Sequence, residues 1–162
     1  MNYKITIITP TFNRAHTLER VYRSILDQNF KNLKWLVMDD GSTDDTKQLI
    51  DRLKSENKIS IDYVFKPNRR KYVTLMDGIF NYINTEYFIV MDSDDEFHSN
   101  SIEKFYNEIE KIKDDKHLGS VCGNVVDSNG EFVGTKFPQS SLDGSVFELR
   151  LKYNVQGGKI AT

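Results

Sequence analysis

The chain has 162 residues, enough for one domain with a substantial core, and its 38% hydrophobic and 28% charged residues are typical of a soluble globular protein. A formal net charge of −2 excludes a strong overall attraction to nucleic acid or to an anionic membrane. The single cysteine, Cys122, excludes an internal disulfide and is expected to be a small buried side chain in a reducing compartment.

Short apolar strands alternate with amphipathic helices, which predicts an α/β fold with a mostly parallel sheet and helices on both faces. Strands are expected at residues 4–9 (ended by Pro10), 34–38, 61–65, 87–91 and 118–126. Apolar stripes predict the intervening helices: Leu18-Val21-Tyr22-Ile25-Leu26, Leu49-Ile50-Leu53, Leu75-Met76-Ile79-Phe80-Ile83 and Ile102-Phe105-Tyr106-Ile109-Ile112.

Turn and capping residues punctuate this pattern. The run Ser42-Thr43-Asp44-Asp45 has capping-box spacing and is expected to open the second helix. Asn100 or Ser99, with Glu103, is expected to cap the fourth. Ser128-Asn129-Gly130 predicts a hairpin turn that leads into a strand at 132–135, so strand-helix alternation ends after about residue 118.

Four polar loops follow the first four strands. They begin at Thr9, Asp39, Lys66 and Asp92, and in an open parallel sheet the carboxyl ends of the strands form the ligand-binding edge. The last loop, Asp92-Ser93-Asp94-Asp95-Glu96, carries four carboxylates in five residues, which repel one another unless they are hydrated or bind a cation. Oxygen ligands suit Mg²⁺ or Mn²⁺, and the Arg69-Arg70-Lys71 run in the preceding loop could neutralise a diphosphate. Together these loops favour a nucleoside diphosphate.

Three segments carry a resemblance to a known family. ITPTFNRAHTLERVYRSILDQNF, LVMDDGSTDDT and FIVMDSDDEF occur in order at the intervals seen in the family 2 glycosyltransferases, an inverting group with the Rossmann-like GT-A fold. The resemblance runs from about Tyr3 to at least Phe105. It implies a single GT-A domain whose nucleotide-sugar-binding half spans residues 1–115, with residues 116–162 beginning the acceptor-side half.

The resemblance also implies roles for individual residues. Pro10, Thr11 and Phe12 lie along the nucleobase, Asp40 accepts a hydrogen bond from the base, and Lys71 lies near the diphosphate. Asp92 contacts the ribose or the metal, and Asp94 ligates Mn²⁺ or Mg²⁺ directly. The implied nucleotide-sugar contacts are Pro10, Thr11, Phe12, Arg14, Asp40, Lys71, Asp92 and Ser93, and the implied metal ligands are Asp94 and Asp92.

The expected activity is transfer of a hexosyl or N-acetylhexosaminyl group, with inversion, from a nucleotide sugar to a glycan, lipid-linked or protein acceptor, as in polysaccharide biosynthesis. UDP is the favoured nucleotide. The chain departs from the family pattern at Arg69 and Arg70, where many members have glycine, and at Ser99, where many have proline.

The general base that inversion requires is not evident in the sequence. Four acidic residues after Asp95 are expected to be surface charges rather than this base: Asp127, Glu131, Asp143 and Glu148. The chain is therefore expected to be truncated. Alternatives are a catalytically incomplete nucleotide-sugar-binding fragment or a non-enzymatic divalent-metal-binding module. An EF-hand-like spacing of Asp92, Asp94, Glu96 and Glu103 is set aside because the sixth position is Phe97 rather than glycine.

No long apolar segment is present that could serve as a secretory signal or span a bilayer. We therefore expect a cytoplasmic protein that does not bind nucleic acid. Peripheral contact with the inner face of the membrane and self-association into a homo-oligomer are left open.

Overall fold

The computed structural model describes residues 2–115, 117, 120–127, 129–134 and 159–161. The chain divides into two compact units, Met1–Lys104 and Phe105–Thr162.

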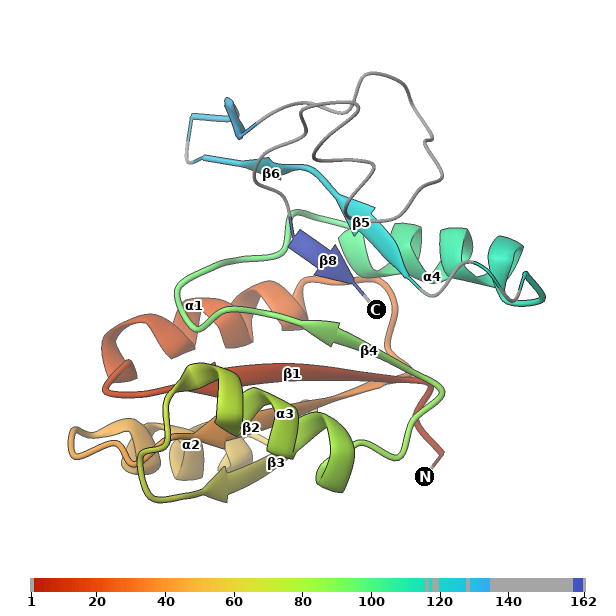
Figure 1. Cartoon of the computed structure of the whole chain (residues 1–162). Coiled ribbons are helices and arrows are strands. Elements are labelled where there is room, and N and C mark those ends of the chain that lie inside the picture. The colour runs from red at the N-terminus through yellow and green to blue at the C-terminus, as the bar shows by residue number, and fades with distance from the viewer. Residues whose placement is uncertain (1, 116, 118–119, 128, 135–158, 162) are drawn as a thin grey trace. The chain divides into compact units, whose positions relative to one another are not determined.

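The first unit alternates strands and helices (Figure 1). Its elements are β1 (Ile5–Thr11), α1 (Ala15–Leu26), β2 (Leu33–Asp39), α2 (Thr46–Ser55), β3 (Ser60–Phe65), α3 (Lys71–Tyr82), β4 (Tyr87–Val90) and the start of α4 (Ser101–Ile112). The strands lie in the order β3-β2-β1-β4, and all three pairings are parallel. The predicted α/β architecture is confirmed.

Strand β1 continues through Pro10, so the prediction that this proline ends the strand is wrong. Pro10 lies opposite Met38 in the β1–β2 register. The β1–β4 pairing ends at Ile8 and Val90, and the Met91 amide donates to the Ile8 carbonyl at 2.9 Å. Because alternate residues of a strand point their amides to the same side, Pro10 faces the side where β4 has already ended. Its missing N–H therefore costs no ladder bond.

Helices α1 and α2 cover one face of the sheet. Tyr22 of α1 stacks on Trp35 of β2, with ring centroids 6.1 Å apart, and both side chains are fully buried. The Trp35 indole N–H donates to the Thr9 hydroxyl at 2.9 Å, so the polar atom of this buried indole is paired.

Helix α3 covers the opposite face, where Ile8, Leu36 and Met38 form a buried cluster. Gly78 allows the close approach, because a Cβ there would lie 2.5 Å from Ile8 Cδ1 and 2.9 Å from Met38 Cγ. Phe80 was expected in the buried stripe of this helix, but it is 75% exposed. The helix turns it away from the sheet, and Tyr82 and Ile83 pack against the cluster further along the chain.

Neither predicted helix cap is formed as expected. At α2 the Ser42 hydroxyl accepts from the Asn13 amide, and Asp44 Oδ1 instead accepts from the Thr46 amide at 3.1 Å. At α4 the Ile102 amide donates to the side chain of Gln28, which is buried beside α1. The start of α2 therefore uses Asp44 of the predicted run rather than Ser42, and the start of α4 uses a side chain from outside its local capping motif.

The second unit contains the rest of α4 and four short strands, β5 (Val121–Gly123), β6 (Val125–Val126), β7 (Phe132–Val133) and β8 (Lys159–Ala161), among its described residues. The single strand predicted over 118–126 is interrupted at Asn124. The predicted hairpin is confirmed, since β6 pairs antiparallel with β7 and Asp127 Oδ1 accepts from the Asn129 and Glu131 amides. Strand β5 pairs antiparallel with β8. The single cysteine, Cys122, lies in β5 and is half-buried, and this burial raises the pKa of its thiol.

Within the described part of the chain, no helix is long and apolar enough to cross a membrane.

Gly78→Ala is expected to destabilise the fold. The methyl group gains about 1 kcal/mol of helix propensity but overpacks Ile8 and Met38, which costs about 1–3 kcal/mol. We expect a lower urea midpoint at unchanged m-value. Asn107→Ala, at an exposed position of α4, is the control and should leave the midpoint equal or slightly higher. A Gly78→Ala variant as stable as the native chain would mean that α3 is free to move off the sheet.

Candidate nucleotide-sugar site

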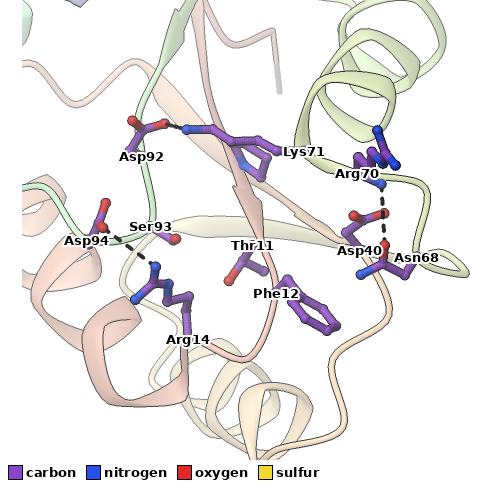
Figure 2. A pocket seen from close by; sticks show the side chains of 11 residues that line it. Thr11, Phe12, Arg14, Asp40, Asn68, Arg70, Lys71, Asp92, Ser93 and Asp94 are labelled. Atoms are coloured by element: carbon purple, nitrogen blue, oxygen red, sulfur yellow. Dashed lines mark hydrogen bonds and ion pairs between the residues drawn. The ribbon is translucent and has the colours of Figure 1, made fainter.

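A cavity of about 300 Å³ lies at the carboxyl ends of β1, β2, β3 and β4. This edge includes the point between β1 and β4 where the strand order reverses, which is where open α/β sheets bind ligands. The cavity is lined by Pro10, Thr11, Phe12, Arg14, Asp40, Asn68, Arg70, Lys71, Asp92, Ser93 and Asp94 (Figure 2).

The loop after β2 packs directly on the loop after β3. Gly41 has φ +87°, and a Cβ at this position would lie 2.9 Å from the Asn68 backbone nitrogen. Only glycine combines this backbone conformation with so close an approach. The contact holds Asp40 and the residues that follow Asn68 on one side of the cavity.

Asp40 is only 3% exposed and lies under this junction. Its Oδ1 accepts from the Arg69 amide at 2.8 Å and from the Thr74 hydroxyl at 2.5 Å. No described residue hydrogen-bonds to Oδ2, and Asp40 lines the cavity. One carboxylate oxygen therefore fixes the loop and α3, while the other is available to a ligand.

The neighbouring Asp39 has a structural role. This carboxylate is fully buried and accepts from the Ser42 amide at 2.7 Å and from the Tyr63 hydroxyl at 2.6 Å. Burial, then the hydrogen bond to Asp39 and the charge of Asp39, raise the pKa of Tyr63, so the hydroxyl stays a donor. Asn13 joins the first two loops, since its side-chain oxygen accepts from the Thr43 amide at 2.8 Å.

The acidic loop after β4 gathers carboxylates at the other end of the cavity. One carboxylate oxygen from each of Asp92, Asp94 and Asp95 lies within 4.8 Å of the other two. Lys71 Nζ is 2.7 Å from Asp92 Oδ1, and an Arg14 guanidinium nitrogen is 3.9 Å from Asp94 Oδ2. The repulsion expected from the sequence is thus offset by two cations from other loops.

The EF-hand-like spacing has no counterpart in the structure. Glu96 pairs with Arg20 at 3.4 Å, and Arg20 also donates to the Asp94 carbonyl at 3.1 Å. Neither Glu96 nor Glu103 belongs to the described group of carboxylates that could share an ion.

Every residue expected to bind nucleotide sugar or metal lines this one cavity, from Pro10 to Asp94. The basic run is divided: Arg70 and Lys71 line the cavity, but Arg69 lines a separate cavity beside α3. Asn68 also lines the site, although its residue type gave no signal in the sequence. The Thr74 hydroxyl donates to Asp40 from the first turn of α3. In the sequence, a threonine among the apolar residues of the predicted helix was the signal that could have indicated this role.

The sequence matches one protein-family model over almost its full length. The model described as glycosyl transferase family 2 matches residues 6–160, nearly the whole chain. The chain belongs to glycosyl transferase family 2.

Curated relatives agree. This family 2 chain is 35% identical over 143 residues to an uncharacterised glycosyltransferase of Rickettsia conorii, covering 84% of the chain and 23% of that protein. It is 34% identical over 104 residues to the Campylobacter jejuni GalNAc(5)-diNAcBac-PP-undecaprenol beta-1,3-glucosyltransferase, covering 61% of the chain and 32% of that protein. The chain thus spans only about a quarter to a third of the length of these two relatives.

Solved structures share the fold. A Pyrobaculum calidifontis mannosyltransferase in complex with GDP-Man and Mn²⁺ superposes with a TM-score of 0.64 at 22% identity, over 78% of this chain and 36% of that one. The S. aureus TarS 1-349 complex with UDP gives 0.57 at 20% identity, over 79% and 43%. The predicted GT-A fold is confirmed.

Two of the acidic residues that were expected to be surface charges lie in the described part of the chain. Asp127 is exposed and its Oδ1 caps the β6–β7 turn, where Glu131 is also exposed. Asp143 and Glu148 lie outside the described residues.

Asp44 is expected to make the folding stability of this family 2 chain depend on pH in the acid range. Burial opposes ionisation, but the Thr46 hydroxyl and the Ala15 and Thr46 amides hold the pKa of Asp44 below its ordinary 3.8. A lowered folded-state pKa contributes stability above the unfolded value, and that stability is lost as pH falls through the folded value. Asp44→Asn should therefore lose less stability than the native chain between about pH 5 and pH 2 in thermal unfolding.

The control for this experiment is Asp45→Asn. Asp45 is exposed and makes no side-chain cap bond, so this variant makes the same change of charge as Asp44→Asn without removing a hydrogen bond. Parallel curves for Asp44→Asn and the native chain would contradict the assignment.

Proposed function

We propose that this chain binds a nucleoside-diphosphate sugar, with UDP as the favoured nucleotide and a divalent cation at Asp92 and Asp94. We also propose that the protein transfers the sugar, with inversion, to a glycan, lipid-linked or protein acceptor. In this proposal residues 1–115 form the donor-binding half and residues 116–162 begin the acceptor side.

The observation that carries the proposal is the arrangement of charges in one cavity. Three aspartate carboxylates within 4.8 Å of one another offer the oxygen ligands that Mn²⁺ and Mg²⁺ prefer. Lys71 and Arg14 lie beside them and bring positive charge to the same cavity. Free phosphate needs only the cations, whereas a metal-bound diphosphate uses both groups.

The opposite end of the cavity suits a nucleobase. Phe12 is 45% exposed and offers an aromatic face for stacking. Asp40 Oδ2 can accept the imide N–H of uracil, because Oδ1 is already held by Arg69 and Thr74. Thr11 Oγ1 is buried, lines the same cavity and has no hydrogen-bond partner among the described residues, which is consistent with a ligand partner.

In the proposed reaction the chain's own residues bind and orient the donor. Lys71 and Arg14 exchange their ion pairs with Asp92 and Asp94 for contacts with diphosphate oxygens, which offsets charge on the leaving group. A divalent cation at Asp92 and Asp94, when bound, supplies Lewis-acid stabilisation of the departing diphosphate. We propose that the general base for the acceptor hydroxyl lies outside the described residues.

The ligands bound to structural relatives belong to the class of ligand proposed here. TarS structures hold UDP or UDP-GlcNAc, and the Pyrobaculum mannosyltransferase holds GDP-Man and Mn²⁺. These are properties of those proteins, and in each case the ligand contains a nucleoside diphosphate.

Thermal unfolding with UDP, GDP, CDP and dTDP, each with and without Mn²⁺, tests the proposal. A nucleotide at 100 times its Kd should add about 2.7 kcal/mol of stability. We expect this gain to require Mn²⁺ and to be lost in Asp94→Ala, whose side chain is 52% exposed and can be removed without opening the core.

Asp45→Ala is the matched control, since it removes an exposed acid outside the cavity and should keep the full gain. Stabilisation by Mn²⁺ alone, with no effect of any nucleotide, would favour a metal-binding module. An equal gain in Asp94→Ala would remove Asp94 from the site.

A further inference from the structure

Arg70 has a backbone conformation that few side chains adopt. Its φ is 76° and its ψ is 144°, beyond the left-handed helical region and close to a region essentially confined to glycine. The other described non-glycine residues with positive φ are all asparagines, the type most tolerant of it: Asn13, Asn57 and Asn100. A residue in such a conformation costs about 1–3 kcal/mol and persists only where its surroundings impose it.

The surroundings of Arg70 do impose this conformation. The Arg69 amide is held by buried Asp40, and the Arg70 amide donates to Asn68 Oδ1 at 3.4 Å. Helix α3 begins at the next residue, and the Thr74 amide donates to the Arg70 carbonyl at 3.2 Å. The chain must therefore turn sharply at residue 70, where glycine would be free of strain.

The Arg70 side chain makes no hydrogen bond or ion pair with any described residue, although Arg70 lines the cavity. The other two cations of the cavity, Lys71 and Arg14, are both paired with aspartates. Figure 2 shows Arg70 beside Asp40 and Asn68, away from the Asp92 and Asp94 end. A strained backbone thus carries a guanidinium that no described residue pairs with, and this guanidinium belongs to the same cavity as Asp40.

The two side chains have opposite hydrogen-bonding character. A guanidinium only donates and a carboxylate only accepts. We propose that Arg70 and Asp40 together select the nucleobase, with Arg70 donating to a ring carbonyl and Asp40 accepting from the adjacent ring N–H. Uracil, thymine and guanine present this carbonyl and N–H side by side. Cytosine and adenine present an amino donor and a ring-nitrogen acceptor in those places, which opposes both side chains.

This inference rests on the proposed function and adds base selection to it. The cleanest comparison is UDP against CDP, because their ribose and diphosphate are identical and only the base edge differs. GDP against ADP repeats the comparison for purines.

The experiment is calorimetric titration of each nucleotide, with Mn²⁺, into the native chain, Arg70→Gly and Arg70→Lys. We expect the native chain to prefer UDP over CDP, and Arg70→Gly to reduce that preference roughly tenfold or more through loss of a charged donor. Arg70→Lys keeps N–H donors and should retain most of the preference. Arg70→Gly should also raise Tm by roughly 2 to 4 °C, because relief of strain exceeds the entropy that glycine adds to the unfolded chain.

Arg69→Ala is the matched control, because it removes the neighbouring cation from a different cavity and should leave the UDP/CDP ratio unchanged. An equal loss of UDP and CDP affinity in Arg70→Gly would place Arg70 on the diphosphate and overturn the inference. An unchanged ratio would overturn it as well. If no nucleotide bound the native chain, the proposed function itself would fail, and base selection with it.

Discussion

Burial of Asp40 at the end of β2 is the constraint on which the cavity depends. A carboxylate that is 3% exposed must be paired, and Oδ1 takes both the Arg69 amide and the Thr74 hydroxyl. These two bonds join the sheet to the loop after β3 and to the first turn of α3. They also fix the turn at Arg70 and the start of α3 at Lys71, and hence where two of the cavity's cations lie. The position of Oδ2 in the cavity follows from the same anchorage.

The parallel sheet explains why so much of the site could be predicted from the sequence. Strand-helix alternation is local, and once it is recognised the carboxyl ends of all the strands must meet at one edge. Residues as distant as Thr11, Asp40 and Asp94 therefore come together without any detailed knowledge of side-chain contacts. Topology alone was enough to gather the residues, and the family resemblance suggested what each of them contacts.

Features that depend on non-local partners could not be predicted in this way. Gln28 caps α4 across 74 residues of sequence, and no local motif at Ser99 or Asn100 reveals it. Pro10 stays within β1 because β4 ends early, which is a property of another strand. Arg69 and Arg70 are adjacent and chemically identical, yet the turn at residue 70 sends them to different cavities.

Structural and ligand-facing polar groups are divided along the same loops. One group has side-chain oxygens that accept hydrogen bonds from nearby backbone amides: Asp39, Asn13 and Asp44. These residues stabilise the loops around the cavity and do not line it. Asp92 and Asp94 instead hold cations from other loops at a more exposed end, where ion pairs are weak and can be exchanged for a ligand. Arg70 is the exception to both groups. It combines backbone strain with a side chain that no described residue binds. Strained residues lower the stability of the fold and are concentrated at ligand-binding sites, so this combination is expected where a residue contacts a ligand.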